Sequence, residues 1–173
     1  MTQHFSITDL FTIGIGPSSS HTVGPMRAAR DFAERALERP DVGQVVCELY
    51  GSLALTGHGH ATDTAILLGL AGHSPEGVCP DAIAGLVADI RHVDRLMLAG
   101  RVDIAFVETR HLLFRKGEFL PGHANAMRFT ATPNKRQCRL LLSFRRLWAS
   151  SHVKCLIKHS KSRICWTACW VNT

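Results

Sequence analysis

The segment at residues 14–26 constrains the fold of this chain more than any other stretch; it reads Gly-Ile-Gly-Pro-Ser-Ser-Ser-His-Thr-Val-Gly-Pro-Met. Three consecutive hydroxyls and an imidazole, bracketed by glycines and prolines, suit neither a strand nor a helix interior. Apolar residues then recur at helical spacing from Met26 to Leu37, which predicts a helix beginning near Pro25. Hydroxyls and free backbone N–H groups thus meet at a helix N-terminus, a place that favours an anion. A plain capped helix with a serine-rich entry turn is the alternative.

A second polar turn, at residues 56–63, contains His58, His60 and Asp63. The His-x-His-x-x-Asp spacing could bind zinc if the turn aims both imidazoles at one ion. The turn contains no cysteine, however, and histidines in glycine-rich turns are also often solvated or hydrogen-bonded to the backbone. A histidine that titrates near neutrality can instead move protons as a general acid or base. We expect acid–base chemistry here and no metal.

The remaining apolar patterns predict an α+β fold, with a small mixed sheet covered by two or three helices. A β-branched run that contains Cys47 predicts a buried strand with this cysteine in the core. The clearest helix opens at Pro80 and Asp81, keeps one apolar face and is expected to stop near Gly100. The other predicted elements are strands at 45–50, 102–108, 112–115 and 126–132, and a short buried helix at 65–71.

Basic residues gather at the C-terminal end of the chain. Residues 135–173 contain 9 Lys and Arg and no Asp or Glu, which leaves 11 basic and 14 acidic residues in the first 134. Because these first 134 residues are mildly acidic, we expect no specific nucleic-acid partner. No apolar run is long enough to span a membrane, and the N-terminus has neither a basic region nor an apolar signal core. These features predict a soluble, cytoplasmic protein with no membrane partner.

Three separated blocks carry a family resemblance. They are the loop at 14–26, Leu-Tyr-Gly-Ser-Leu-Ala-Leu-Thr-Gly-His-Gly-His-Ala-Thr-Asp at 49–63, and His-Ala-Asn-Ala-Met-Arg-Phe at 123–129. In this order they resemble the N-terminal (beta) domain of the bacterial single-chain iron-sulfur L-serine dehydratases, over about residues 5–133. We therefore predict a serine dehydratase beta-type domain at 1–133 and a separate basic tail at 134–173.

The resemblance implies a lyase that converts L-serine to pyruvate and ammonia in amino-acid degradation and gluconeogenesis. In the family a four-iron, four-sulfur cluster is the Lewis acid that takes the hydroxyl, and its cysteines belong to a following helical domain that this chain does not contain. We accordingly expect L-serine as ligand, a missing or separately encoded cluster-binding domain as partner, and a homodimer as a further arrangement. We expect no cofactor on this chain and an N-terminal fragment that is inactive alone.

The same resemblance implies catalytic roles for His21 and His60. The expected substrate ligands are Ser18, Ser19, Ser20, Thr22 and Asn125, with His58 and Asp63 as secondary candidates. Each has a structural alternative, because serine hydroxyls cap helices, an aspartate favours a helix N-terminus and an asparagine suits a turn. Three consecutive hydroxyls nevertheless exceed what one helix cap needs.

The tail departs from the family pattern after Pro133. It contains all three tryptophans, four of the six cysteines and no acidic residue, with no sustained period of 2 or 3.6. Residues 147–158 can be back-translated with permissible codons and read in another reading frame. The peptide that results is polar and acidic, and it is closer to what the family has at this place. We predict an out-of-frame segment that is disordered or poorly packed and is not a domain. A metal site is the alternative, with candidate ligands His152, Cys155, His159, Cys165 and Cys169, although their spacing forms no Cys-x-x-Cys knuckle.

Two functions from different classes fit this sequence. The first is the substrate-side half of a serine dehydratase, with His21 and His60 lining a cleft that a cluster domain completes. The second is an amino-acid-binding regulatory or association module without catalysis. It follows from the similarity between the family's N-terminal domain and a regulatory domain of phosphoglycerate dehydrogenase. Binding of L-serine without turnover would favour the second function.

Overall fold

The computed structural model describes residues 14–39, 41–121, 123–133, 158–160 and 163–169. Helix α1 (Val23–Ala36) begins directly after the polar loop, which confirms the helix predicted near Pro25. Its apolar positions recur every three or four residues and are buried, as expected of one helix face against a core. The polar loop therefore leads into the N-terminus of a long, well-packed helix.

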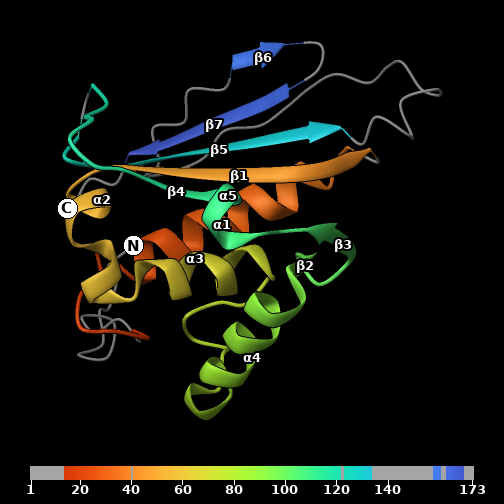
Figure 1. The fold of residues 1–173 in the computed structure, drawn as a ribbon, viewed down its shortest axis with the longest axis horizontal. Coiled ribbons are helices and arrows are strands. Elements are labelled where there is room, and N and C mark those ends of the chain that lie inside the picture. The colour runs from red at the N-terminus through yellow and green to blue at the C-terminus, as the bar shows by residue number, and fades with distance from the viewer. Residues whose placement is uncertain (1–13, 40, 122, 134–157, 161–162, 170–173) are drawn as a thin grey trace, which may run out of the picture.

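Strand β1 (Val42–Gly51) belongs to a mixed sheet of five strands. It pairs antiparallel with β5 (Asn125–Pro133) and parallel with the edge strand β4 (Leu112–Arg115). Beyond β5 the sheet continues through β7 (Arg163–Cys169) and β6 (Lys158–Ser160), in the order β4-β1-β5-β7-β6. Figure 1 shows α1 and α3 on one face of this sheet and α4 farther from it. The α+β class with a small mixed sheet is confirmed.

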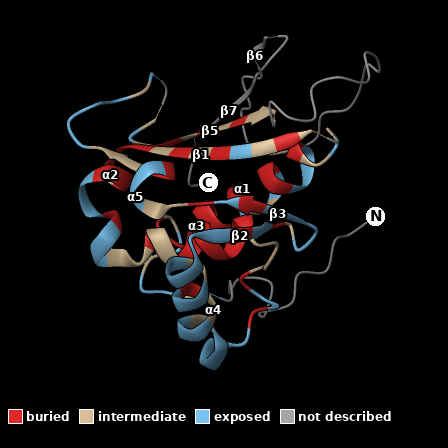
Figure 2. Ribbon diagram, turned by 45° about the vertical axis from the view of Figure 1, so that its right-hand side comes forward, coloured by how far each residue is buried: buried red, intermediate tan, exposed pale blue. Residues whose placement is uncertain are grey.

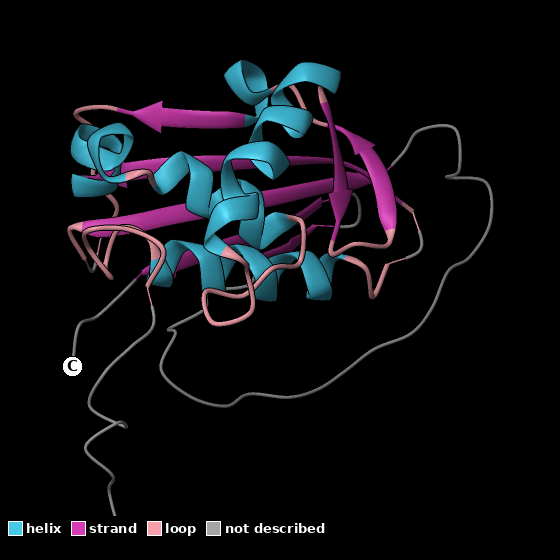
Figure 3. Ribbon diagram, turned by 90° about the horizontal axis from the view of Figure 1, so that it is seen from below, coloured by secondary structure: helices cyan, strands magenta, loops and turns pink. Residues whose placement is uncertain are grey.

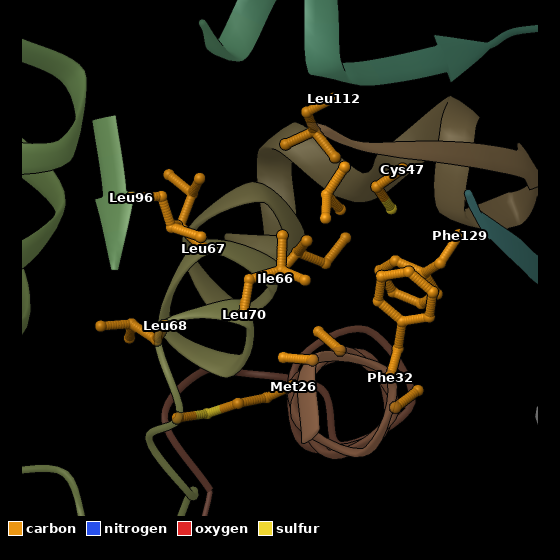
Figure 4. Packing of buried hydrophobic residues seen from close by; sticks show 14 of the residues in the cluster. Met26, Phe32, Cys47, Ile66, Leu67, Leu68, Leu70, Leu96, Leu112 and Phe129 are labelled. Carbon is orange, nitrogen blue, oxygen red and sulfur yellow. The ribbon is translucent and has the colours of Figure 1, made fainter. Parts of the chain in front are cut away.

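The core lies between this sheet and the helices. Cys47 of β1 pairs in register with Phe129 of β5, and both side chains are fully buried, which confirms Cys47 as a core residue. Phe129 stacks on Phe32 of α1, with ring centroids 4.9 Å apart (Figure 4). Figure 2 shows that burial concentrates along β1, α1 and α3. The apolar side chains packed there join α1, which follows the polar loop, to β1.

Helix α3 (Thr62–Leu70) packs against α1 and is buried along nearly its whole length. It confirms the short buried helix predicted from residue 65, although it begins three residues earlier. Gly69 permits the close approach, because a Cβ at this position would collide with the carbonyl oxygen of Met26.

Helix α4 (Pro80–Val93) is shorter than the sequence predicts, and its extension to Gly100 is wrong. Asp94 adopts a left-handed conformation, with φ of 52°, and ends the helix. The chain then forms a hairpin of β2 (Arg95–Leu98) and β3 (Val102–Ala105). In β2, Leu96 and Leu98 alternate with exposed residues and are buried in the core. Leu96 also fits the helical spacing in the sequence, but the structure buries it as part of a strand.

Three short helical segments were not predicted. Helix α2 (Ser52–Thr56) lies between the predicted strand and the predicted polar turn at 56–63 and overlaps that turn only at Thr56. The 3-10 turn η2 (Gly57–His60) lies within the predicted turn. Helix α5 (Glu108–His111) follows β3, so the strand predicted at 102–108 ends early at Ala105. The strands predicted at 112–115 and 126–132 are present.

The basic tail contributes β6 and β7, which the sequence pattern did not indicate. The backbone of β7 pairs with β5 between Ala126 and Ala131. Residues 134–157 lie outside the described residues, and so do the side chains of the predicted alternative metal ligands in the tail. In the part of the chain that the structure describes, no helix has the length and apolar character needed to cross a bilayer.

Candidate active site

His21 lies at the centre of a small polar cluster just before α1. The turn that carries it is closed by the backbone N–H groups of His21 and Thr22, which both donate to the carbonyl oxygen of Ser18. His21 is 9% exposed. Its Nδ1 lies 3.0 Å from Ser20 Oγ, and its Nε2 lies 3.0 Å from Thr56 Oγ1. Both ring nitrogens are therefore engaged by hydroxyls.

The partners of Thr56 determine which nitrogen of His21 carries the proton. The Thr56 hydroxyl donates its only hydrogen to the carbonyl oxygen of Ser52, at 3.0 Å. It must therefore accept from Nε2–H of His21, and Nδ1 in turn accepts from Ser20. Burial lowers the pKa of His21, and so does the nearby His60 imidazole, whereas a hydrogen bond with Ser52 raises it. The net effect favours a neutral His21.

His60 is held differently. Its Nδ1 lies 3.0 Å from the carbonyl oxygen of Thr56, which can only accept, so Nδ1 carries a hydrogen. In the neutral ring Nε2 is then the basic nitrogen, and within the described part of the chain it makes no hydrogen bond. The ring is partly exposed and lies 4.9 Å from the His21 ring, centroid to centroid. The structure thus brings together the two histidines that the sequence indicates.

Helix α2 supplies two hydroxyls that the sequence analysis missed. Ser52 and Thr56 are four residues apart, so they lie one helical turn apart, and both contact Nε2 of His21. Gly51 directly precedes the helix, and its φ of 57° turns the chain sharply out of β1. The Ser-x-x-x-Thr spacing inside the second block was the available signal, but the sequence pattern predicts no helix at residues 52–56 and places only Thr56 in the polar turn.

The third block closes the same end of the sheet. The Ser52 N–H donates to the carbonyl oxygen of Ala124, at 2.9 Å, and Asn125 pairs in register with Gly51. The side-chain oxygen Oδ1 of Asn125 is buried and has no hydrogen-bond partner among the described residues. A buried acceptor without a donor costs free energy, and such atoms are often completed by a ligand or water. His123 orients this turn, because its Nδ1 accepts from the Asn125 N–H at 2.9 Å.

The predicted serine and threonine ligands differ in their surroundings. Ser18 Oγ lies 3.1 Å from Ser20 Oγ, so these two hydroxyls form one row beside His21. Ser19 is exposed. Thr22 is completely buried, and its hydroxyl donates to the Ser18 carbonyl at 2.7 Å, which stabilises the loop. Their roles as substrate ligands stay predictions.

His58 and Asp63 do not join this cluster. His58 is exposed and stacks on Phe114, with centroids 3.9 Å apart. Asp63 accepts from Arg91 at 2.9 Å and lies 3.8 Å from His58 Nδ1. His60 contacts His21 instead, so the His-x-His-x-x-Asp residues do not converge. Among the described residues there is no group of three or more His, Cys, Asp or Glu that could hold a metal ion.

The cysteines with described side chains do not fit an iron-sulfur cluster. Cys47 is buried in β1, where burial raises the pKa of its thiol well above the usual value, with a smaller contribution from Glu48. Cys79 is exposed and precedes α4. A cluster requires several convergent thiolates, so these two do not form such a site.

Comparison with known proteins identifies the family. A family model described as the serine dehydratase beta chain matches residues 6–144. The chain belongs to the serine dehydratase beta chain family. It is 45% identical to L-serine dehydratase 1 of Escherichia coli over 130 residues, which cover 73% of this chain and 28% of that protein. It is 50% identical to the L-serine dehydratase of Streptomyces coelicolor over 125 residues, which cover 70% of this chain and 28% of that protein.

A third relative, the L-serine dehydratase of Haemophilus influenzae, is 40% identical over 135 residues, which cover 76% of this chain and 30% of that protein. The resemblance found in the three sequence blocks is therefore confirmed at the level of the family. The matched part of this chain spans less than a third of the length of these relatives.

Proposed function

We propose that this chain forms the substrate-binding and proton-transferring half of an L-serine dehydratase, with His60 as the general base. The observation that carries the proposal is the hydrogen bond from His60 Nδ1 to the Thr56 carbonyl. Because Nδ1 carries the hydrogen of that bond, Nε2 of the partly exposed ring is the nitrogen that can accept a proton. The family supports serine as the substrate, because the relatives named above are L-serine dehydratases.

Formation of pyruvate and ammonia from serine requires removal of the Cα proton and departure of the β-hydroxyl. His60 Nε2 would take the Cα proton. His21 would act as a positioning residue, because it is buried and both of its nitrogens are occupied by hydroxyls. Its neutral ring beside His60 also avoids a second positive charge when His60 becomes protonated. Departure of the hydroxyl needs a Lewis acid, which we expect from the cluster domain outside this chain.

The polar groups around the histidines suit the ends of an amino acid. The unpartnered Oδ1 of Asn125 is an acceptor and would receive a hydrogen bond from the substrate ammonium. The hydroxyls of Ser18 and Ser20 can donate to a carboxylate. Ser52 connects the two segments that carry these groups, because its hydroxyl contacts His21 and its backbone N–H donates to the carbonyl oxygen of Ala124. The arrangement supports recognition of one small amino acid at this end of the sheet.

The test of the catalytic proposal is pyruvate formation by this chain mixed anaerobically with the cluster-containing remainder of a relative. His60→Ala should lower kcat about 100-fold or more, because a positioned general base contributes about 10²–10⁴-fold. His58→Ala is the matched control, since His58 lies two residues away, is exposed and stacks on Phe114. Equal losses in the two variants, or full activity of His60→Ala, would exclude His60 as the base.

A binding module without catalysis is the second candidate function, and the unpartnered Asn125 Oδ1 favours it, because this atom requires only a donor. We expect this chain alone to bind L-serine in a calorimetric titration and to form no pyruvate. Asn125→Ala should weaken binding about tenfold through loss of one hydrogen bond to a charged group. Pyruvate formed by the chain alone and lost in His60→Ala would show instead that the chain is active without a partner.

A further inference from the structure

Ala61 adopts a left-handed backbone conformation directly after His60. Its φ is 57° and its ψ is 34°. Among the described residues, two others that are not glycine have positive φ, namely Asp94 and Ala99. The Cβ atom makes this conformation unfavourable for alanine, so it persists where the surrounding structure holds it in place.

Ala61 is the single residue between two helical segments. It follows η2 and precedes α3. Its N–H donates to the carbonyl oxygen of His58, at 3.4 Å, and its own carbonyl oxygen accepts from the N–H of Ala65, at 3.0 Å. The helices cover one face of the sheet (Figure 3), and Ala61 turns the chain into one of them, α3. The direction of η2 relative to α3 therefore depends on the two backbone angles of Ala61.

Contacts with His21 leave the chain on both sides of Ala61. On the side of η2, Thr56 Oγ1 lies 3.0 Å from His21 Nε2, and the His60 ring lies 4.9 Å from the His21 ring, centroid to centroid. On the side of α3, the buried hydroxyl of Thr62 donates to the carbonyl oxygen of His21, at 2.7 Å. His21 thus closes the segment 56–62 into a loop, which holds the conformation of Ala61 from both sides.

We propose that Ala61 is a positioning residue, which sets the separation of the His21 and His60 rings through its left-handed backbone. This inference rests on the proposed function, in which His60 is the base and His21 is its neutral neighbour. Rotation of Ala61 into the right-handed helical region would change the direction of η2 relative to α3, and the His60 ring would leave its place beside His21. Displacement of a reacting group by about 1 Å can lower a rate about 100-fold.

Ala99 provides a matched control. It is also an alanine of intermediate exposure with a left-handed backbone, with φ of 47°. It lies in the turn between β2 and β3, and its N–H donates to the carbonyl oxygen of Leu70, at 2.8 Å. No described contact joins it to a candidate site residue. The same substitution at Ala61 and at Ala99 therefore strains the backbone at two places, of which one adjoins the histidines.

The experiment compares Ala61→Val, Ala61→Gly and Ala99→Val in the full chain by NMR. Valine is β-branched and disfavours positive φ, whereas glycine adopts it freely. The nuclear Overhauser contact between the ring hydrogens of His21 and His60 should be present in the unmodified chain, in Ala99→Val and in Ala61→Gly. It should be lost in Ala61→Val. In the pyruvate assay with the cluster-containing remainder of a relative, Ala61→Val should lower kcat about 10-fold or more with a smaller change in KM, and Ala99→Val should keep kcat.

Several outcomes would overturn this inference. They are absence of the ring contact in the unmodified chain, its retention in an Ala61→Val chain that is folded by circular dichroism, and its loss in Ala61→Gly or in Ala99→Val. If Ala61→Val does not fold, Ala61→Gly decides. Relief of the left-handed strain should leave the urea midpoint of Ala61→Gly equal to or above that of the unmodified chain, and a lower midpoint would contradict the inference.

The same variants separate this inference from the proposed function. His60→Ala tests the base and leaves the backbone of Ala61 unchanged. If His60→Ala retains pyruvate formation while Ala61→Val loses the ring contact, the proposed base is wrong and Ala61 still positions the two rings. If His60→Ala forms no pyruvate while Ala61→Val keeps the ring contact, the base stands and the role of Ala61 is wrong.

Discussion

At the residue scale, His111 shows how burial decides the state of an imidazole. The backbone N–H of Val107 donates to its Nδ1 at 2.8 Å, so the neutral ring carries its hydrogen on Nε2. Nε2 lies 2.9 Å from Nε2 of the Gln44 side-chain amide on β1. Because an amide NH₂ cannot accept from the ring Nε2–H, the amide must be turned over so that its oxygen faces His111. Protonation of Nδ1 would remove the hydrogen bond from Val107. His111 therefore joins α5 to the sheet only in its neutral form.

Stability should fall as the pH is lowered from 7.5 to 5. Burial, with a smaller effect of Arg110, lowers the pKa of His111 below its ordinary value of 6.5, and burial with His60 does the same for His21. The unfolded chain then binds more protons than the folded chain, so these groups contribute fully above pH 6.5 and less below it. Urea unfolding at several pH values measures this slope.

The variant His111→Gln provides the control for the pH experiment. It should cost about 1–2 kcal/mol at pH 7.5, because it disturbs hydrogen bonds with Val107 and Gln44. It should also reduce the slope between pH 7.5 and 5. A slope as steep as that of the unmodified chain would assign the pH dependence to other groups.

The residue types in the sequence predicted only part of the candidate site. His21 and His60 stood out because each lies in a polar, glycine-containing block, and the structure places their rings 4.9 Å apart. Ser52 and Thr56 did not stand out, since a hydroxyl four residues from another is common in helices. Their importance comes from the three-dimensional position of α2 beside the loop before α1.

At the element scale, the packing of α3 on α1 depends on Gly69. We expect Gly69→Ala to lower the free energy of unfolding by about 1–3 kcal/mol, because its Cβ would push against Met26 and Ala29 of α1. Gly85→Ala in α4 is the matched control. A Cβ there meets no atom within 4 Å, and alanine is the better helix former, so this variant should gain about 0.5–1 kcal/mol.

Denaturant unfolding of the two glycine variants would test this contrast between open and closed helix surfaces. Equal changes in the free energy of unfolding for Gly69→Ala and Gly85→Ala would mean that the α1–α3 contact accommodates the added Cβ at no cost. The comparison matters for the site, because α1 and α3 begin at the two polar segments that carry His21 and His60. A shift of one helix against the other would separate the two imidazoles.

At the scale of the whole molecule, we expect residues 1–133 to fold without the tail at 134–173. The buried apolar side chains that the structure describes all lie between Val23 and Ala131. A chain of residues 1–133 would lose β6 and β7 and expose the edge of β5, but it would keep the described core. We expect cooperative unfolding and an intact near-ultraviolet signal from Tyr50. A molten chain without a cooperative transition would show that the tail is part of the domain.

The sequence by itself determined the family, the α+β class, the helix after the polar loop and the two histidines of the candidate site. These features depend on local periodicity and on residue types in three blocks. The tertiary structure decided where α4 ends, because Asp94 turns the chain so that Leu96 and Leu98 enter the core from a strand. It also decided the tautomers of His21 and His60 and the unpartnered state of Asn125 Oδ1, since each depends on partners from other segments or on backbone geometry. Hydrophobic periodicity indicates which residues are buried, whereas proton positions and strand pairing depend on atoms that the fold brings together.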